Sequence, residues 1–224
     1  MLPRILEPEV MDSAAEAVDY DSMDHSHVNR LFADDFLALV PPQATDKLVS
    51  VLDVGTGTAQ IPIEICRRRK DLRITAIDLA GNMLQVAQRN VIREGFTAQI
   101  KLEQIDAKAL PFHDLKFDAV ISNSIIHHIP EPRFVFREMS RVLRCGGLLF
   151  VRDLLRPHDL ETLKRLVTTY AGLANEHQQH MFGDSLHAAL SVDEARELLA
   201  SSGLPVEWAT QTSDRHWTIA GRRP

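Results

Sequence analysis

The sequence is poor in the features that define several classes of protein. It has only two cysteines, Cys66 and Cys145, and they are too far apart to form a paired metal-binding motif. No apolar run approaches the ~20 residues that a membrane-spanning helix needs. Both thiols are therefore expected to stay reduced and to take no part in the chemistry, and no membrane span is predicted.

Positive charge is also scarce. Lys and Arg number 25 against 31 Asp and Glu, which gives a formal net charge of -6. Proteins that bind nucleic acids usually show a basic footprint, so no nucleic-acid partner is expected. The concentrated basic run Arg67-Arg68-Arg69-Lys70 is interpreted as a solvated helix end that suits the helix dipole. The N-terminus lacks the apolar core of a signal peptide, so a cytoplasmic location is expected.

What the sequence does have is a regular alternation of strand and helix patterns. Strands are predicted over 49–54, 73–77, 98–104, 117–122 and 147–154, and helices over 60–70, 81–94 and 131–143. This alternation predicts a parallel sheet with helices on both faces. After a further helix at 191–202, two short strands at 205–212 and 215–222 are separated by Ser213-Asp214, which is typical of a hairpin.

The segments outside this alternation are less regular. Residues 1–11 contain Pro3 and Pro8 and are predicted to be loosely ordered. Residues 12–40 are predicted to be helical, and Pro41-Pro42 is expected to end that helix. A helix is also predicted over 159–175, and it is followed at 176–190 by a polar segment that contains His and Gln.

The first predicted strand ends in an acid that is followed by a glycine turn, Asp53-Val54-Gly55-Thr56-Gly57. Glycines let the backbone turn tightly and approach a ligand closely, and the next helix offers free N–H groups. The dinucleotide-binding fingerprint requires Gly or Ala at its sixth position, where this sequence has Gln60. The stretch predicts an adenosine-type cofactor and leaves both NAD and S-adenosylmethionine (SAM) open.

Polar residues also follow the next predicted strands. Asp78 is placed to accept hydrogen bonds from a ribose diol, although it would equally suit a helix cap. Asp106 is placed to accept a hydrogen bond from an adenine amino group, although Asp also forms turns. Asn123, His127 and His128 follow the fourth strand, and the carboxyl ends of parallel strands line the ligand crevice.

In this order the motifs resemble those of the class I SAM-dependent methyltransferases, and within them the small-molecule and quinone-biosynthesis subgroup. The resemblance is carried by Leu52–Gly57, Asp78, Asp106-Ala107 with Leu110-Pro111-Phe112, Phe117-Asp118, His127-His128-Ile129-Pro130 and Arg141–Gly147. Two positions depart from the family pattern, because Ala59 replaces the third glycine and Cys145 replaces the usual proline.

The resemblance implies a Rossmann-like, doubly wound α/β fold whose seven-stranded sheet is mostly parallel with an antiparallel last strand. One methyltransferase domain is expected to span residues 1–224. Its parts are expected to be a helical lid at 1–47, a SAM-binding core at 48–158, an acceptor segment of helix and loop at 159–190, and a final helix and β-hairpin at 191–224.

The resemblance also implies roles for individual residues. The expected SAM-binding residues are Tyr20, Asp53, Gly55, Thr56, Gly57, Asp78, Leu79, Met83, Asp106, Ala107 and Asn123. His127, His128 and Asp153 are the candidate catalytic residues, with packing or a salt bridge to Arg152 or Arg156 as the alternative. No metal site is expected, since His177, His180 and His187 lack a cysteine or acidic partner at ligand spacing.

The expected activity is methyl transfer from SAM to a small-molecule acceptor, with S-adenosylhomocysteine as the product. A nucleic-acid or protein methyltransferase and a non-catalytic SAM-binding protein remain alternatives, and a NAD-dependent oxidoreductase is weakened by Gln60 and the hairpin. A monomer or homodimer is expected. The sequence identifies neither the acceptor nor the acceptor atom.

Overall fold

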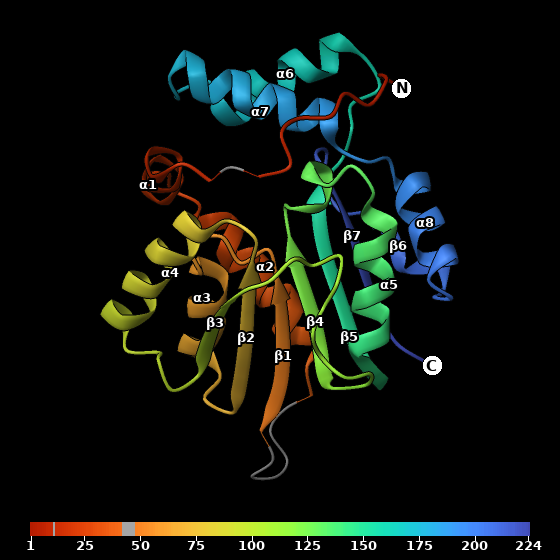
Figure 1. Ribbon diagram of the computed structural model, residues 1–224. Coiled ribbons are helices and arrows are strands. Elements are labelled where there is room, and N and C mark those ends of the chain that lie inside the picture. Colours follow the sequence, from red (N-terminus) through yellow and green to blue (C-terminus); the bar gives the residue numbers. More distant parts are fainter. Residues whose placement is uncertain (11, 42–47) are drawn as a thin grey trace.

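A computed structural model describes residues 1–10, 12–41 and 48–224 and shows a seven-stranded sheet flanked by helices (Figure 1). The strand order is β3-β2-β1-β4-β5-β7-β6. The strands are β1 (Val49–Val54), β2 (Leu72–Asp78), β3 (Ile100–Gln104), β4 (Phe117–Asn123), β5 (Leu143–Leu154), β6 (Ala209–Gln211) and β7 (His216–Arg222).

The strand directions confirm the predicted mixed sheet. Strands β1 to β5 pair in parallel, with Leu52 opposite both Thr75 of β2 and Val120 of β4. Strand β7 runs antiparallel to β5 and also pairs with β6 in an antiparallel hairpin. The order reverses between β1 and β4, and in open α/β sheets ligands bind in the crevice at such a point.

Helices cover both faces of the sheet, as a doubly wound fold requires. The helices of the described residues are α1 (Ala14–Ser22), α2 (Ser26–Leu39), α3 (Gln60–Arg68), α4 (Gly81–Glu94), α5 (Pro132–Val142), α6 (Leu160–Ala171), α7 (Glu176–Ala188), α8 (Val192–Ser201) and two short 3-10 turns, η1 (Ile126–His128) and η2 (Val206–Trp208). Helices α2, α3 and α4 share one buried core, and α5 and α8 share the other.

Aromatic packing holds α2 against the centre of the sheet. Phe32 and Phe36 are fully buried, and their rings lie 4.9 and 6.0 Å from the ring of Phe150 on β5. Burying an aromatic side chain contributes about 1.5–3 kcal/mol each, so this contact fixes α2 beside the fifth strand. Asn29, which precedes Phe32 on the same helix, then lies within hydrogen-bond reach of Gln60 after the glycine turn.

The helical prediction for 12–40 was only partly right. The chain forms two helices that are broken at Met23–His25, where the Asp24 carboxylate accepts a hydrogen bond from the Ser26 N–H at 3.0 Å. This local side-chain bond competes with helix propagation. The second helix ends at Leu39; Pro42 and the expected boundary at residue 47 lie outside the described residues.

The polar segment 176–190 is mostly helical, and the sequence patterns did not place a separate helix there. Asn175 caps α7 through a capping box with Gln178. Leu186 of this helix packs against Leu166 of α6. Figure 1 shows α6 and α7 together across the top of the molecule, on the side of the sheet where the N-terminal segment also lies.

The first ten residues are held by specific contacts, so the prediction of a loosely ordered segment was wrong. The backbone N–H groups of Leu2 and Ile5 donate to the carbonyls of Pro157 and His187. The Arg4 guanidinium donates to the carbonyls of Ala188, His127 and Ile129. These partners are more than 120 residues away in the chain, so no local pattern in the sequence could have indicated them.

Candidate active site

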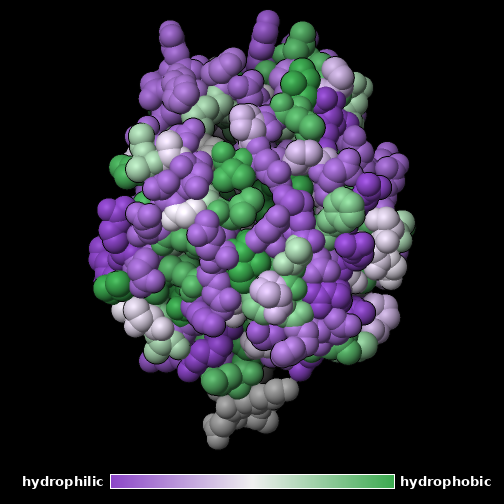
Figure 2. All heavy atoms as spheres, viewed as in Figure 1, coloured by the Kyte–Doolittle hydropathy of each residue, from purple (hydrophilic) through white to green (hydrophobic). Residues whose placement is uncertain are grey.

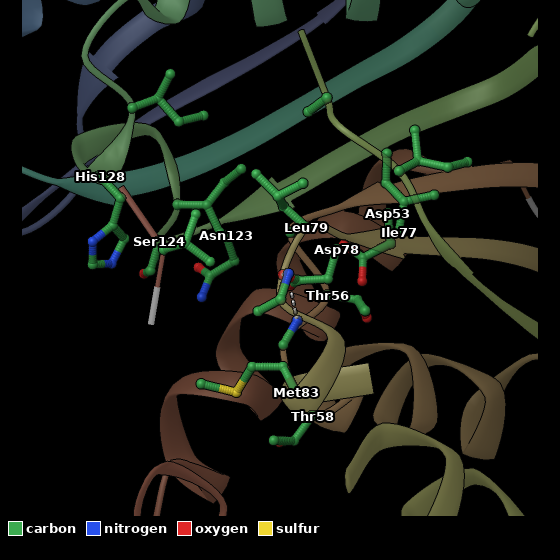
Figure 3. Close-up of a pocket in the computed structure, with 18 of the residues that line it drawn as sticks. Asp53, Thr56, Thr58, Ile77, Asp78, Leu79, Met83, Asn123, Ser124 and His128 are labelled. Carbon is green, nitrogen blue, oxygen red and sulfur yellow. Dashed lines mark hydrogen bonds between the residues drawn. The ribbon is translucent and has the colours of Figure 1, made fainter. Parts of the chain in front are cut away.

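One cavity lies at the carboxyl ends of β1, β2, β3 and β4 (Figure 3). Figure 2 shows hydrophobic residues gathered in a hollow near the middle of this face, among hydrophilic ones. The residues that line the cavity include all eleven that the sequence pointed to, namely Tyr20, Asp53, Gly55, Thr56, Gly57, Asp78, Leu79, Met83, Asp106, Ala107 and Asn123.

The glycine turn forms the floor of this cavity. Gly55 has φ +76°, and a Cβ at this position would lie 2.3 Å from Cγ2 of Ile125, which leaves no space for a side chain. Gly57 has φ +55°, with only Tyr20 near the place of a Cβ, at 3.8 Å. Ala59 also has a positive φ, of 62°. The alanine that replaces the family's third glycine therefore keeps the glycine-like backbone.

Asp78 is held in a fixed orientation by backbone groups. One carboxylate oxygen accepts the Gly57 N–H at 2.7 Å, and the other accepts the Ala80 N–H at 2.9 Å. Burial raises the pKa of Asp78, and these N–H groups partly offset that effect. Each carboxylate oxygen has a second acceptor site, so Asp78 can bind both hydroxyls of a diol without moving.

The glycine turn and the residue after it hold buried oxygen atoms that make no aligned hydrogen bond to the described residues. They are one carboxylate oxygen of Asp53 and the hydroxyl oxygens of Thr56 and Thr58. Burial raises the pKa of Asp53 to about 7, so its charged form is destabilised. Leaving such groups unpaired costs free energy, and a polar or cationic ligand would satisfy them.

The N-terminal segment covers the cavity at the carboxyl end of β3. Asp106 accepts the Lys108 N–H at 2.9 Å in a tight turn. The Lys108 ammonium pairs with Glu9, and Glu9 and Val10 line the cavity. Sequence reasoning missed Glu9, Val10 and Lys108. Lys108 could have been predicted, because it follows Asp106-Ala107 directly. The contact with Glu9 could not, because it joins positions 99 residues apart.

The two N-terminal helices are tied to the glycine turn through Gln60. The amide of Gln60 accepts a hydrogen bond from Asn29 at 3.0 Å and donates one to the Asp21 carboxylate at 3.1 Å. Asn90 donates to the same carboxylate at 2.8 Å. The residue that breaks the dinucleotide fingerprint therefore binds α1 and α2, and this places Tyr20 at the rim of the cavity.

The two histidines after β4 have different surroundings. His127 is 3% exposed, and its Nδ1 lies 2.5 Å from the Asp153 carboxylate, which also accepts the Ile126 and Leu154 N–H groups. Burial opposes charge on the pair, but the opposite charges raise the pKa of His127 and lower that of Asp153. His128 lines the cavity, and neither His127 nor Asp153 is among the lining residues.

The arginines that flank Asp153 form ion pairs of their own. Arg152 lies 2.6 Å from Asp35 of α2, and Arg156 lies 2.8 Å from Glu194 of α8. Both guanidinium groups are nearly buried, so removal of either partner would leave an uncompensated charge. These contacts favour a structural role for the two arginines.

Comparisons with known proteins agree with this geometry. A family model described as a methyltransferase domain matches residues 52–151. The 27-O-demethylrifamycin SV methyltransferase of Amycolatopsis mediterranei is 30% identical over 194 residues, covering 85% of this chain and 66% of that protein. The demethylmenaquinone methyltransferase of Porphyromonas gingivalis is 32% identical over 142 residues, covering 62% and 57%. The chain belongs to the class I SAM-dependent methyltransferase family.

A solved structure of a family member supports the fold independently. The SAM-dependent methyltransferase from Aquifex aeolicus has a TM-score of 0.67 at 16% identity, covering 94% of this chain and 98% of that chain. The predicted family and fold are therefore confirmed. The chain spans less than two thirds of the length of either curated relative. The matched segment 52–151 contains the glycine turn, Asp78, Asp106 and both histidines, but not the N-terminal segment.

The residues present fit the family's cosubstrate. A SAM molecule has a ribose diol, an adenine ring and an amino-acid tail, and the cavity offers a distinct polar group for each. Asp78 is preoriented for the diol, Asp106 lies at the next strand end, and the unpaired oxygens of Asp53, Thr56 and Thr58 lie at the turn. A pyrophosphate would instead place two negative charges against these acids.

Proposed function

We propose that the protein transfers a methyl group from SAM to a small-molecule acceptor, with S-adenosylhomocysteine as the product. The observation that carries the proposal is that a single cavity holds the glycine turn, the preoriented Asp78, Asp106 and an imidazole, that of His128. Figure 3 shows His128, Ser124 and Asn123 on one side of this space and Asp78 with Met83 on the other.

The acidic and glycine residues would bind the methyl donor. When bound, SAM supplies a methyl group that is already activated by its positively charged sulfur. Asp78 would accept the ribose hydroxyls, Asp106 and Ala107 would contact the adenine, and the turn at Asp53–Gly57 would face the amino-acid tail. Tyr20 at the rim is positioned to place its ring near the sulfonium, where a cation–π contact favours the charged donor.

The protein's main tasks are then to align the acceptor and to exclude water. Positioning alone can supply ~7–11 kcal/mol of barrier reduction in favourable cases. The N-terminal segment, α1 and the loop after β4 surround the cavity and serve this purpose. His128 is placed to take a proton from the acceptor, and His127 with Asp153 holds the loop from below.

A small acceptor fits better than a nucleic acid. Three residues of the basic run are engaged in ion pairs, with Arg67 on Glu64 and Glu94, Arg68 on Asp34 and Glu64, and Arg69 on Asp71. These pairs neutralise the charges that would contact phosphates. Among the described residues, no helix combines the length and apolar character needed to cross a membrane.

The proposal is tested by product formation. The protein is incubated with SAM and a panel of small phenols, catechols, quinols, carboxylic acids and amines, and S-adenosylhomocysteine is quantified by mass spectrometry. We expect product with at least one hydroxylated small molecule, and loss of product in an Asp78→Ala variant. SAM binding without product from any small acceptor, or product only with RNA or protein, would contradict the proposal.

A further inference from the structure

The N-terminal segment places a carboxylate beside the two histidines. Glu7 follows the part of the segment that Arg4 anchors to the carbonyls of His127 and Ile129. Its side chain is 15% exposed, and its second oxygen accepts the Ser185 hydroxyl of α7 at 3.4 Å. Glu7 is therefore held between the loop after β4 and the helices above it.

One oxygen of Glu7, Oε1, lies close to both imidazole rings. It is 3.0 Å from Nδ1 of His128 and 3.6 Å from Nε2 of His127. The Oε1 atom and His128 Nδ1 are both buried, and neither has an aligned hydrogen bond among the described residues. A small rotation of the His128 ring would therefore bring its Nδ1–H onto Glu7 Oε1, which is closer to His128 than to His127.

The two histidines cannot play the same role. His127 is fixed by Asp153 at Nδ1 and packs at 4.1 Å, centroid to centroid, below the ring of His128. Only His128 lines the cavity. If Glu7 holds its Nδ1–H, the lone pair lies on Nε2, the other ring nitrogen of this cavity-lining residue. The carboxylate then fixes the imidazole tautomer, as the third member of a catalytic triad does.

We propose that Glu7 is the positioning residue of His128, and that the acceptor is a hydroxylated molecule that must lose a proton when it is methylated. The proposal rests on the proposed methyl transfer. The acceptor oxygen forms a bond to the methyl carbon, the carbon–sulfur bond breaks, and its electron pair stays on the sulfur. The proton moves to Nε2 of His128, and Glu7 stabilises the resulting imidazolium until the proton is lost to solvent.

The charged groups around this pair are consistent with that sequence. Asp153 from β5, Arg4 and Glu7 from the N-terminal segment, and His127 from η1 all lie near one another. Burial would raise the pKa of Glu7, but the two histidines lower it overall, which keeps the carboxylate charged. The cluster therefore holds a negative charge where the imidazolium forms.

The first test reads the tautomer directly and needs no acceptor. Histidine 15N–1H correlation spectra are recorded on the full-length protein saturated with S-adenosylhomocysteine. We expect the Nδ1–H tautomer at His128, its loss in Glu7→Gln, and its recovery in Glu7→Asp. Glu197→Gln, at an exposed position on α8, is the control and should leave the spectrum unchanged. An Nε2–H tautomer in the unmodified protein would overturn the proposal.

The second test separates positioning from folding. With a hydroxylated acceptor from the panel, Glu7→Gln should lower kcat by about tenfold or more, while the Kd for SAM changes less than twofold. If kcat and the affinity for SAM fell by the same factor, the role of Glu7 would be merely structural. If no acceptor is found, the tautomer result still decides the role of Glu7, so the two proposals fail separately.

A metal ion is the competing explanation for these contacts. Glu7, His127 and His128 present three ligand atoms within 4.8 Å of one another, and Asp153 supports His127 as an outer carboxylate would. Titration with Zn²⁺ and with Co²⁺ tests this explanation. One tightly bound equivalent that Glu7→Gln abolishes would overturn the proposal, whereas no binding, and activity unchanged by EDTA, would support it.

Discussion

Asp53 links the affinity for SAM to pH. Its carboxyl group is 3% exposed, one oxygen has no partner among the described residues, and burial raises its pKa to about 7. The proposed ligand brings an ammonium group to this turn. A cation stabilises the carboxylate, so binding should release the proton that Asp53 carries in the free protein.

The size of the effect follows from the pKa. A group with a pKa of about 7 is only about 3% ionised at about pH 5.5 and about 50% ionised at pH 7. If SAM binds the carboxylate form, its affinity should rise more than about tenfold over this window. The window ends below about pH 8, since an α-amino group of the ligand itself titrates there.

The assay is calorimetry of SAM binding at several pH values, in two buffers of different ionisation enthalpy. We expect uptake of a proton by the buffer near pH 6, and loss of both this signal and the pH dependence in Asp53→Asn. Affinity that is flat between pH 5.5 and 7 in the unmodified protein would refute the reasoning.

The raised pKa of Asp53 also predicts how the stability of the fold depends on pH. The folded protein binds the Asp53 proton more tightly than the unfolded chain, so this group stabilises the fold below the unfolded pKa of about 4. That contribution should be lost progressively as the pH rises from about 4 to about 7. In Asp53→Asn, chemical denaturation should show a flatter profile over this range.

Two further predictions concern the rest of the cavity. Asp78→Ala should weaken SAM binding by about tenfold or more, because charge-assisted hydrogen bonds contribute about 1.5–3 kcal/mol, and unchanged affinity would remove Asp78 from the site. Gly55→Ala should destabilise the fold, because the added Cβ would clash with Ile125. Gly57→Ala should stay folded but bind SAM poorly, because its Cβ meets only Tyr20, at the edge of the cavity. Equal melting temperatures for the two variants would contradict the described turn.

Much of the fold and the cofactor cavity could be predicted because the signals are local. β1 and α4 have the predicted bounds, since an apolar strand that ends in an acid and a helix that ends at a glycine are short-range patterns. The cavity-lining residues follow strand ends, and parallel strands bring their carboxyl ends to one edge. Residue type and position in the alternation were therefore sufficient to group them.

The missed features depend on long-range contacts or on weak patterns. Glu7 meets His127 and His128 only after the chain has folded, because about 120 residues separate them. Helix α7 has few apolar positions in a polar sequence, and its clearest local signal is the capping box from Asn175 to Gln178. The sequence pattern also made both His127 and His128 catalytic candidates. The fold buries His127 and places only His128 at the cavity.

The most direct test of the central claim is calorimetric titration of the unmodified protein with SAM, S-adenosylhomocysteine and NAD. The cavity described predicts that SAM and S-adenosylhomocysteine bind at one site per chain, and that NAD gives no saturable heat. Binding of NAD alone, or of none of the three to a folded protein, would contradict the assignment of this cavity to a methyl donor.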